Sequence, residues 1–473
     1  MSMRLSWLCA VLVGGALLLS LSACSDSSDV GLGVGPTADS LGGGEPQTVD
    51  VLPALLDTTR EVPLTGDNNR ESPARSNWRF LVGAVEDPIT TPALHVEAHG
   101  YLDVAGRSSL PDEIATAVAD SLTAELRLPI TYLHGMSDAP IAVEVYDLSE
   151  EALMDSARAD ASFPADMGMP ASVDTAQIRP TDSLVTIRLR PDWVADNLSV
   201  LKNTNNNGES FEENFPGFKI VAPNSEAVVG FSSLNSALRL TYVPDTLTAD
   251  YAALKSATHI DQHTAPPAPD GYTLLRGGAG VGLALEWEYG EPDIREEVTT
   301  TPAGQLPRLD SLPTNATTSR AEIQVPVDTV EMNTRTASPN FARPLPNGYR
   351  VLATRRPDAD TPTCSSIFGV LGLALDETTC ALPLVSTAAP GAALVGNEYA
   401  LSLFERSFQR IRVGDRSLFT TFRVLIADRS SPDDGSGTTL QTGLPTTVPV
   451  LVPDRTADGA PGPPRATLTV TPL

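Results

Sequence analysis

Apolar and polar residues alternate over short stretches of the chain, with a period of two that is typical of half-buried β-strands. The clearest stretches are 124–128, 142–146, 184–189 and 237–242. Helical periodicity is rare, and its best short candidates are 112–121 and 150–159. Scattered prolines and glycines, 40 and 35 in number, separate the runs. The pattern predicts an all-β protein of short antiparallel strands with few short helices.

Three stretches recur later in the chain in the same order. The segment 79–83 is similar to 273–277, 123–130 to 320–327, and 236–244 to 465–472. Any alternating strand that ends at a proline resembles another, so chance similarity is the alternative explanation. The preserved order favours a duplication. We therefore predict two jelly-roll-like antiparallel β-sandwich domains in tandem.

The spacing of the similar stretches and the proline-rich runs suggest domain boundaries. The offset grows from 194 residues (275 − 81) to 230 (468 − 238), which indicates an insertion in the second copy. Three prolines between 264 and 270 favour a linker. The predicted organisation is a first sandwich at 76–250, a linker at 251–270 and a second sandwich at 271–473.

The N-terminus has the layout of an export signal. Arg4 is the only charge before Cys24, the run 5–21 is apolar or small throughout, and Leu21-Ser22-Ala23 precedes the cysteine. This layout predicts a lipoprotein signal peptide at 1–23 with Cys24 as the lipidated first residue. A chance cysteine near an ordinary cleavage site is the alternative, and the run is at the short limit for a membrane span.

The segment after Cys24 is predicted to be a tether and lead-in, at 24–75. It begins with acidic and serine residues and contains three consecutive glycines at 42–44, which is the composition of a flexible linker. We therefore expect a protein held at the outer membrane by its lipid, on the cell surface or on the periplasmic face. The membrane is then one partner, reached through the N-terminal lipid.

Charge and cysteine content narrow the classes of function. The formal net charge is −27, and lysine occurs only at 202, 219 and 255. Phosphate binding requires clustered basic residues, so we expect no nucleic-acid partner. Cys364 and Cys380 are the only cysteines after Cys24. In an oxidising compartment, two cysteines at this distance predict a disulfide that closes a loop in the second domain.

Histidine pairs are the first candidates for metal chemistry. His259 and His263 are four residues apart, but a prolyl stretch follows, and a metal site requires a third ligand. His95 and His99 have the same spacing in a predicted strand, where they face one side. Linker or structural histidines are the simpler interpretation of both pairs, so we predict no metal site.

Other patterns also fall short of a catalytic site. The glycine run at 277–282 lacks the spacing of a nucleotide-binding loop. The acidic loop at 433–437 has no closing glutamate for a calcium loop. Trp78, Trp193, Trp287, Tyr242 and Tyr289 are candidates for a sugar-stacking groove, although core packing is the usual role of such residues. We predict no catalytic residues and no cofactor.

Several short motifs resemble a known family, the Bacteroidota lipoproteins called domain of unknown function 4270. The motifs are Leu81-Val82-Gly83 with Asp87-Pro88, the glycine motif 275–281, the strand 321–327, and Gly31-Leu32-Gly33 after the signal. Arg276 and the insertion near Cys364 depart from the family's pattern. The resemblance implies an exported lipoprotein and brings no activity and no functional residues.

The function that the sequence favours is that of a non-enzymatic binding or scaffold module anchored in the cell envelope. A protein or a glycan of the envelope is the expected ligand. The alternative is a lipoprotein that binds or processes carbohydrate, which an exposed aromatic groove would favour.

Overall fold

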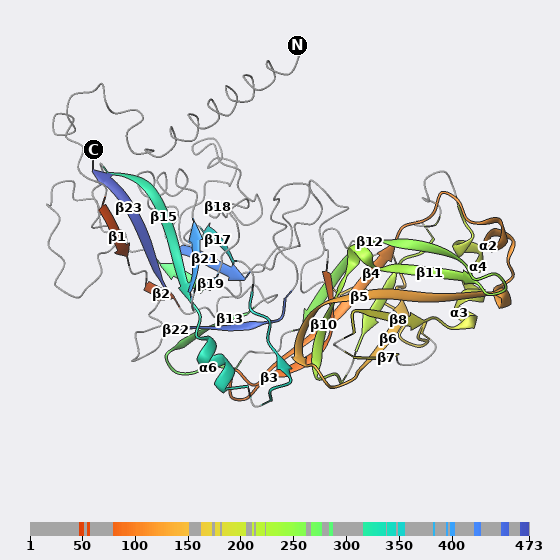
Figure 1. Ribbon diagram of the computed structural model, residues 1–473, viewed down its shortest axis with the longest axis horizontal. Helices are drawn as coiled ribbons and strands as arrows, with labels where there is room; N and C mark the ends of the chain where they lie inside the picture. Colours follow the sequence, from red (N-terminus) through yellow and green to blue (C-terminus); the bar gives the residue numbers. More distant parts are fainter. Residues whose placement is uncertain are drawn as a thin grey trace, which may run out of the picture.

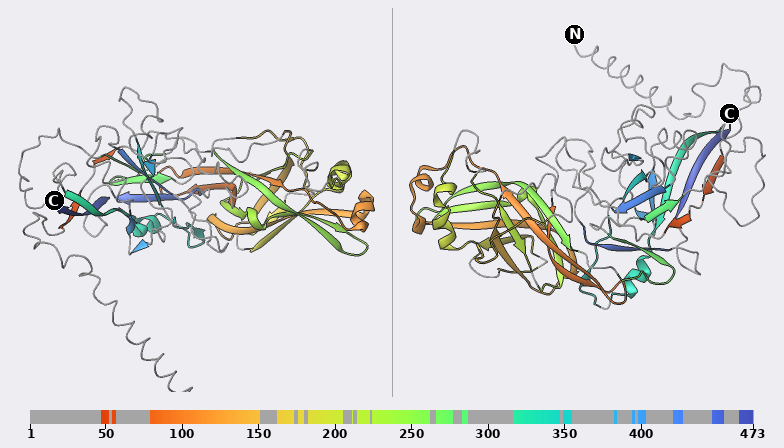
Figure 2. Two further views of the ribbon diagram at one scale, coloured as in Figure 1. Left: turned by 90° about the horizontal axis from the view of Figure 1, so that it is seen from above. Right: turned by 180° about the vertical axis from the view of Figure 1, so that it is seen from behind.

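The computed structural model describes the residues of 79–276 with short gaps, and selected segments on either side. The described residues are 47–51, 54–56, 79–150, 162–172, 176–179, 182–204, 211, 214–222, 224–261, 266–276, 283–286, 316–336, 338–346, 349–354, 382–383, 394–395, 398–402, 421–426, 446–453 and 464–472. Two groups of strands lie along the long axis of the molecule (Figures 1 and 2). We call residues 79–261 the first part and residues 266–472 the second part.

The first part is built around one large antiparallel sheet. Its strands pair in the order β12-β11-β5-β10-β3-β4-β9-β6-β7, and β8 pairs with β5 at the side of this path. The bounds are β3 (Arg79–Asp87), β4 (Leu94–Val104), β5 (Leu122–Met136), β6 (Ile141–Asp147), β7 (Ala176–Ile178), β8 (Leu184–Arg188), β9 (Phe218–Val221), β10 (Ala227–Ser232), β11 (Ala237–Tyr242) and β12 (Leu247–Asp261). Strand β12 pairs with β11 through its first half and with β4 through its second half, so the sheet folds back on itself.

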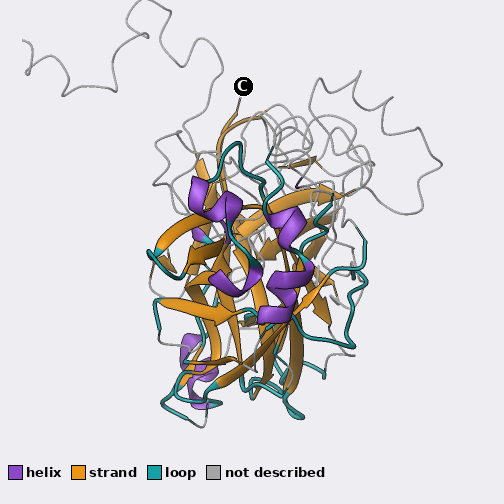
Figure 3. Cartoon of the chain, turned by 90° about the vertical axis from the view of Figure 1, so that its right-hand side faces the viewer, coloured by secondary structure: helices purple, strands orange, loops and turns teal. Residues whose placement is uncertain are grey.

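Strand alternation creates the core that this folded sheet encloses. Leu122, Ala124, Leu126 and Leu128 of β5 are buried, and the residues between them are exposed or half-buried. The same cluster receives side chains from most strands of the first part. Short helices lie at the end where β11 turns into β12 (Figures 1 and 3). They are α2 (Asp112–Thr116), η3 (Ala119–Ser121), α3 (Pro191–Asp196) and α4 (Leu198–Leu201).

The second part contributes three smaller antiparallel sheets. The first has the order β1-β23-β15-β20-β19, the second is β13-β22, and the third is β18-β17-β21-β14-β2. Their bounds are β1 (Gln47–Val51), β2 (Ala54–Leu56), β13 (Tyr272–Arg276), β14 (Leu283–Glu286), β15 (Ala316–Pro326), β17 (Tyr349–Thr354), β18 (Leu382–Pro383), β19 (Leu394–Val395), β20 (Glu398–Ser402), β21 (Thr421–Ile426), β22 (Pro449–Pro453) and β23 (Arg465–Pro472). Strands β1 and β2, from the lead-in, pair with strands of this part.

One strand pairing of the first part recurs in the second part between strands that are similar in sequence. In the first part β3 pairs with β10, and β5 pairs with β11. In the second part β15, which is similar to β5, pairs with β23, which is similar to β11, whereas β13, which is similar to β3, pairs with β22 in a separate two-stranded sheet. The register of the β5–β11 and β15–β23 pairs differs by two residues. Leu240 lies opposite Ala124, whereas Leu468, two residues short of the position that matches Leu240, lies opposite Ala321, which matches Ala124.

The predicted class of fold is confirmed at a coarse level, since the described chain is mostly β-sheet with few short helices. All four stretches of strict alternation lie in strands, namely β5, β6, β8 and β11. The predicted linker at 251–270 needs a correction, because residues 251–261 continue β12 and pair with β4. Tyr251 and Ala257 are buried there, which explains why the segment is ordered as a strand. No helix in the described part is long and apolar enough to cross a membrane.

Candidate functional site

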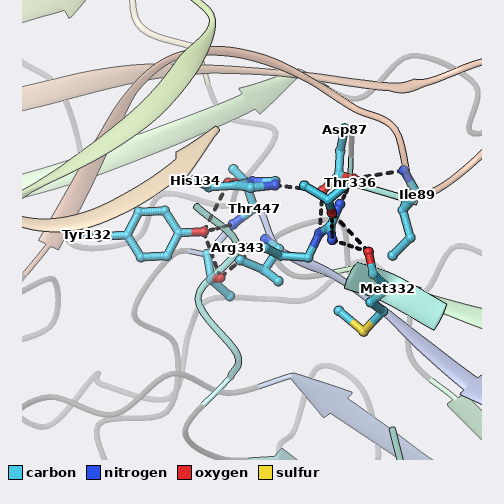
Figure 4. A network of polar contacts seen from close by, with 10 residues as sticks. Asp87, Ile89, Tyr132, His134, Met332, Thr336, Arg343 and Thr447 are labelled. Carbon is cyan, nitrogen blue, oxygen red and sulfur yellow. Dashed lines mark hydrogen bonds and ion pairs between the residues drawn. The ribbon is translucent and has the colours of Figure 1, made fainter. Parts of the chain in front are cut away.

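A fully buried carboxylate, Asp87, lies where the first and second parts meet (Figure 4). It ends β3, and its two oxygens accept four hydrogen bonds. Ile89 N donates to Oδ1 at 2.9 Å, and His134 Nε2 donates to Oδ2 at 2.8 Å. Arg343 donates from Nε to Oδ2 at 3.0 Å and from Nη2 to Oδ1 at 2.5 Å. This two-point contact fixes the plane of the guanidinium against the carboxylate.

Arg343 belongs to the second part, 256 residues further along the chain. It follows β16 (Phe341–Ala342), a two-residue strand that pairs with the end of β5. Its remaining nitrogen, Nη1, donates to Met332 O at 2.8 Å and to Thr336 Oγ1 at 2.7 Å, at the end of α6 (Thr329–Thr334). The guanidinium therefore ties α6 of the second part to β3 of the first.

The other side of His134 faces a second segment from far along the chain. Its Nδ1 lies 2.9 Å from Thr447 Oγ1, just before β22. Tyr132 completes the contact, since its hydroxyl accepts from Thr447 N at 3.0 Å and lies 3.1 Å from Thr447 Oγ1. A continuous chain of hydrogen-bonding groups runs from Tyr132 through Thr447 and His134 to Asp87. We call these four residues and Arg343 the junction network.

Charge and burial act on Asp87 in opposite directions. Burial raises the pKa of its carboxyl, but the hydrogen bonds and charges of His134 and Arg343 outweigh burial and lower the pKa from 3.8 to about 2. Burial also raises the pKa of Tyr132 above its ordinary value, against the hydrogen bonds of the threonines. The network therefore holds an ionised carboxylate opposite a guanidinium, with a neutral phenol beside it.

The order carboxylate, imidazole, hydroxyl is the order of a nucleophilic catalytic triad. A nucleophile must reach a substrate, however, and the Thr447 hydroxyl is enclosed. Thr447 is 1% exposed, and the His134 side chain is not exposed at all. Phe341 packs edge-on against the imidazole, with 5.8 Å between ring centroids. The geometry therefore fits a structural junction between the two parts of the chain.

A second group of ionisable side chains lies on the outer face of the β3, β4 and β12 region. Opposite positions on neighbouring strands are Glu86 with His95, and His99 with His259. His95 Nδ1 lies 2.6 Å from Glu86 Oε1, and His99 Nε2 lies 2.9 Å from Glu97 Oε1. The rings of His99 and His259 have centroids 5.8 Å apart. We call these five residues the histidine face.

The electrostatics of the histidine face include one lysine. Lys219, on β9, lies opposite Tyr101 of β4. Burial lowers the pKa of its ammonium group, and the charge of Glu97 opposes that effect. In the described part of the chain, no three His, Cys, Asp or Glu side chains are arranged, as they stand, into a group that could hold a metal ion.

The third feature is an apolar surface at the end of the first part that carries the short helices. Val118, Val243 and Leu247 are 67%, 51% and 36% exposed. The segments that carry Val118 and Val243 adjoin each other, since Ser121 N donates to Val118 O and Val243 N donates to Ser121 O. Leu247 lies opposite Tyr242 in the hairpin of β11 and β12. We call these three apolar residues the distal end.

Some of the residues that the sequence singles out lie in described strands, and others lie outside the described residues. Cys24, Cys364 and Cys380 lie outside the described residues, as do His263 and the loops at 277–282 and 433–437. His95 and His99 share a face, as predicted. His259 lies in β12 rather than in a linker, and its neighbour is His99.

The aromatic candidates divide in the same way. Trp193 is buried in the core, and its Nε1 donates to both oxygens of Asp147 at 2.8 Å. Trp78, Trp287 and Tyr289 lie outside the described residues, and Tyr242 is half-buried. In the described part, therefore, the only tryptophan of the candidate groove has a core role.

Sequence reasoning missed the junction network as a unit. Asp87 attracted attention only within a short motif, and Arg343 and Thr447 carry no local signal, because their partners are 256 and 313 residues away. The alternation of Tyr132 and His134 along β5 places both on one face, which is the one clue that the sequence holds.

No family model matches the sequence, and no curated protein is similar to it. One solved structure, "BspA_C_WT", aligns with 74% of this chain and 91% of its own at 7% identity. The TM-score of this alignment is 0.14.

Proposed function

We propose that this chain is an exported lipoprotein, acylated at Cys24 and held at the outer membrane, that works as a non-enzymatic binding or scaffold module. The observation that carries the binding role is the distal end, three exposed apolar residues on adjoining segments at one end of a folded sheet. Loops held by a rigid scaffold are the usual place for recognition. The signal layout at 1–23 supports export and lipidation, and the resemblance to the lipoprotein family agrees with both.

Charge around the distal end indicates the chemistry of a partner. Glu113, Asp120 and Asp245 are exposed on the segments that carry the three apolar residues. A protein that places basic residues around an apolar contact would complement such a surface. A glycan partner is less well supported, because sugars stack on exposed aromatic rings and Trp193 is buried in the core.

We also propose that two jelly-roll-like sandwiches arose by duplication. The support is the order of the similar stretches and the pairing of β5 with β11, which β15 and β23 repeat. Duplicated binding modules on one anchor raise avidity without new contacts. A loop closed by a bond between Cys364 and Cys380 would distinguish the second copy.

The test of the binding role compares two variants of the full chain with the N-terminal signal retained. In the first, Val118, Val243 and Leu247 are changed together to serine, and in the matched control only Leu234, 53% exposed on another surface, is changed to serine. Proteins that co-purify with the wild type from gently solubilised membranes are expected to be lost with the first variant and retained with the control. Equal retention by both variants would remove the distal end as the contact.

The test of the anchor is separate. In wild-type cells, mass spectrometry of the mature protein is expected to find an acylated cysteine at position 24, and Cys24→Ala is expected to release the protein from the membrane fraction or leave its signal uncleaved. A different mature N-terminus would overturn the lipoprotein assignment and leave the binding role to be judged on its own test.

A further inference from the structure

Histidine is scarce in this chain, and most of it lies in one place. The sequence holds five histidines, at 95, 99, 134, 259 and 263. Of the four that the structure describes, His134 is sealed in the junction network and the other three lie on the histidine face. Such a concentration on one sheet face brings together the side chains that Zn²⁺, Ni²⁺ and Cu²⁺ prefer.

The geometry of one pair suits a shared ion. His99 and His259 lie directly opposite each other on β4 and β12, with ring centroids 5.8 Å apart and planes inclined by 33°. Two imidazoles that bind one tetrahedral ion at about 2.0 Å have centroids roughly 5 Å apart. A small rotation of either ring closes the difference, because both strands are fixed by the sheet and only side-chain torsions need to change.

We propose that His99 and His259 form a binding site for a divalent transition-metal ion. The two ring nitrogens take the ion in place of their present partners, and water fills the remaining positions. Glu97, whose carboxylate already contacts the His99 ring at 2.9 Å, is the residue best placed to become a third ligand after a change of rotamer. Among the described residues no three such side chains converge as they stand, so the site requires this change of rotamer at Glu97.

The donor set decides the class of ion. Carboxylates alone favour Ca²⁺ and Mg²⁺, which prefer oxygen ligands. Two imidazoles select the softer transition metals instead.

Calorimetric titration of the full soluble chain with Zn²⁺ tests the proposal. Mg²⁺ in large excess occupies the many surface carboxylates and leaves the imidazoles free to bind Zn²⁺. His99→Gln and His259→Gln are each expected to weaken zinc binding about tenfold or more. His95→Gln is the matched control, because this ring lies on the same face with Glu86 as its partner. Thermal melting without zinc checks that every variant is folded.

Three outcomes would overturn the assignment. Equal losses in the variants of His95, His99 and His259 would indicate scattered surface binding. Unchanged affinity in the variants of His99 and His259 would remove the pair altogether. A loss confined to His263→Gln would place the site elsewhere on the chain. The variant of the distal end is expected to bind Zn²⁺ with the affinity of the wild type, because those residues have no part in the site.

Discussion

Asp87 is held by groups that come from three separate stretches of the chain. Removing a carboxylate from water is costly, and four donated hydrogen bonds with an opposing guanidinium compensate for that cost. The arrangement is stable only while every partner is present. A buried charge that loses its partner costs far more than an exposed one, so this residue is sensitive both to substitution and to acid.

Changing Asp87 to asparagine is expected to destabilise the fold by about 3 kcal/mol at neutral pH, because it leaves the Arg343 guanidinium buried without its counter-charge. The folded-state pKa of about 2 lies below the ordinary value of 3.8. The carboxylate therefore contributes stability that is fully present above about pH 4 and is lost as pH falls towards 2, by about 2 kcal/mol. Urea unfolding at a series of pH values measures both effects.

The matched control is Asp245→Asn, in the exposed turn between β11 and β12. It is expected to leave neutral stability within about 0.5 kcal/mol of the wild type. If the Asp87→Asn protein lost stability between pH 4 and 2 as steeply as the wild type, the acid dependence would have another source.

At the scale of the elements, two neighbouring strands of the sheet approach each other so closely that only glycine fits between them. Gly83 of β3 has φ of +121° and lies between β10 and β4. A Cβ at this position would overlap the carbonyl oxygen of Ala227. The backbone there cannot move without separating β3 from β10, and the conformation itself disfavours any other residue.

Gly83→Ala is therefore expected to destabilise the first part by about 3 kcal/mol or more. Gly168→Ala is the control, because that glycine lies in an exposed loop and its Cβ would come no closer than 3.2 Å to a side-chain oxygen of Asp166. Thermal melting of both variants measures the difference. Similar melting temperatures would mean that β3 and β10 can separate at little cost.

Sequence pattern predicts elements well here and predicts their contacts poorly. The period of two identifies β5, β6, β8 and β11, because each has one buried face. The second half of β12 is not predicted as a strand, because the prolines shortly after it favour a linker. Pairing of His99 with His259 depends on a register between strands about 160 residues apart, and no local pattern contains that register.

At the scale of the whole molecule, the junction network makes the first and second parts depend on each other. Ser137 N donates to Asn340 O at 2.8 Å, and β16 adds two residues to the end of β5. With Arg343 and Thr447, these contacts bring two distant segments of the second part against one end of the large sheet. A polar contact that is fully satisfied and sealed from water favours one arrangement of the two parts over others.

We expect that the loss of Arg343, which belongs to the second part, destabilises the ends of the strands of the first part that meet the junction network. Arg343→Leu removes the groups that bind both carboxylate oxygens of Asp87, so that carboxylate remains buried with only His134 and Ile89 N as donors. Amide hydrogen exchange is expected to accelerate at the ends of β3 and β5 that meet the junction, because opening there now exposes the carboxylate to water. Arg320→Leu is the control, since that guanidinium is 66% exposed and pairs with Glu322 away from the junction. Faster exchange confined to residues beyond 266 in both variants would show that the two parts open independently, and the network would then be a local feature of the second part.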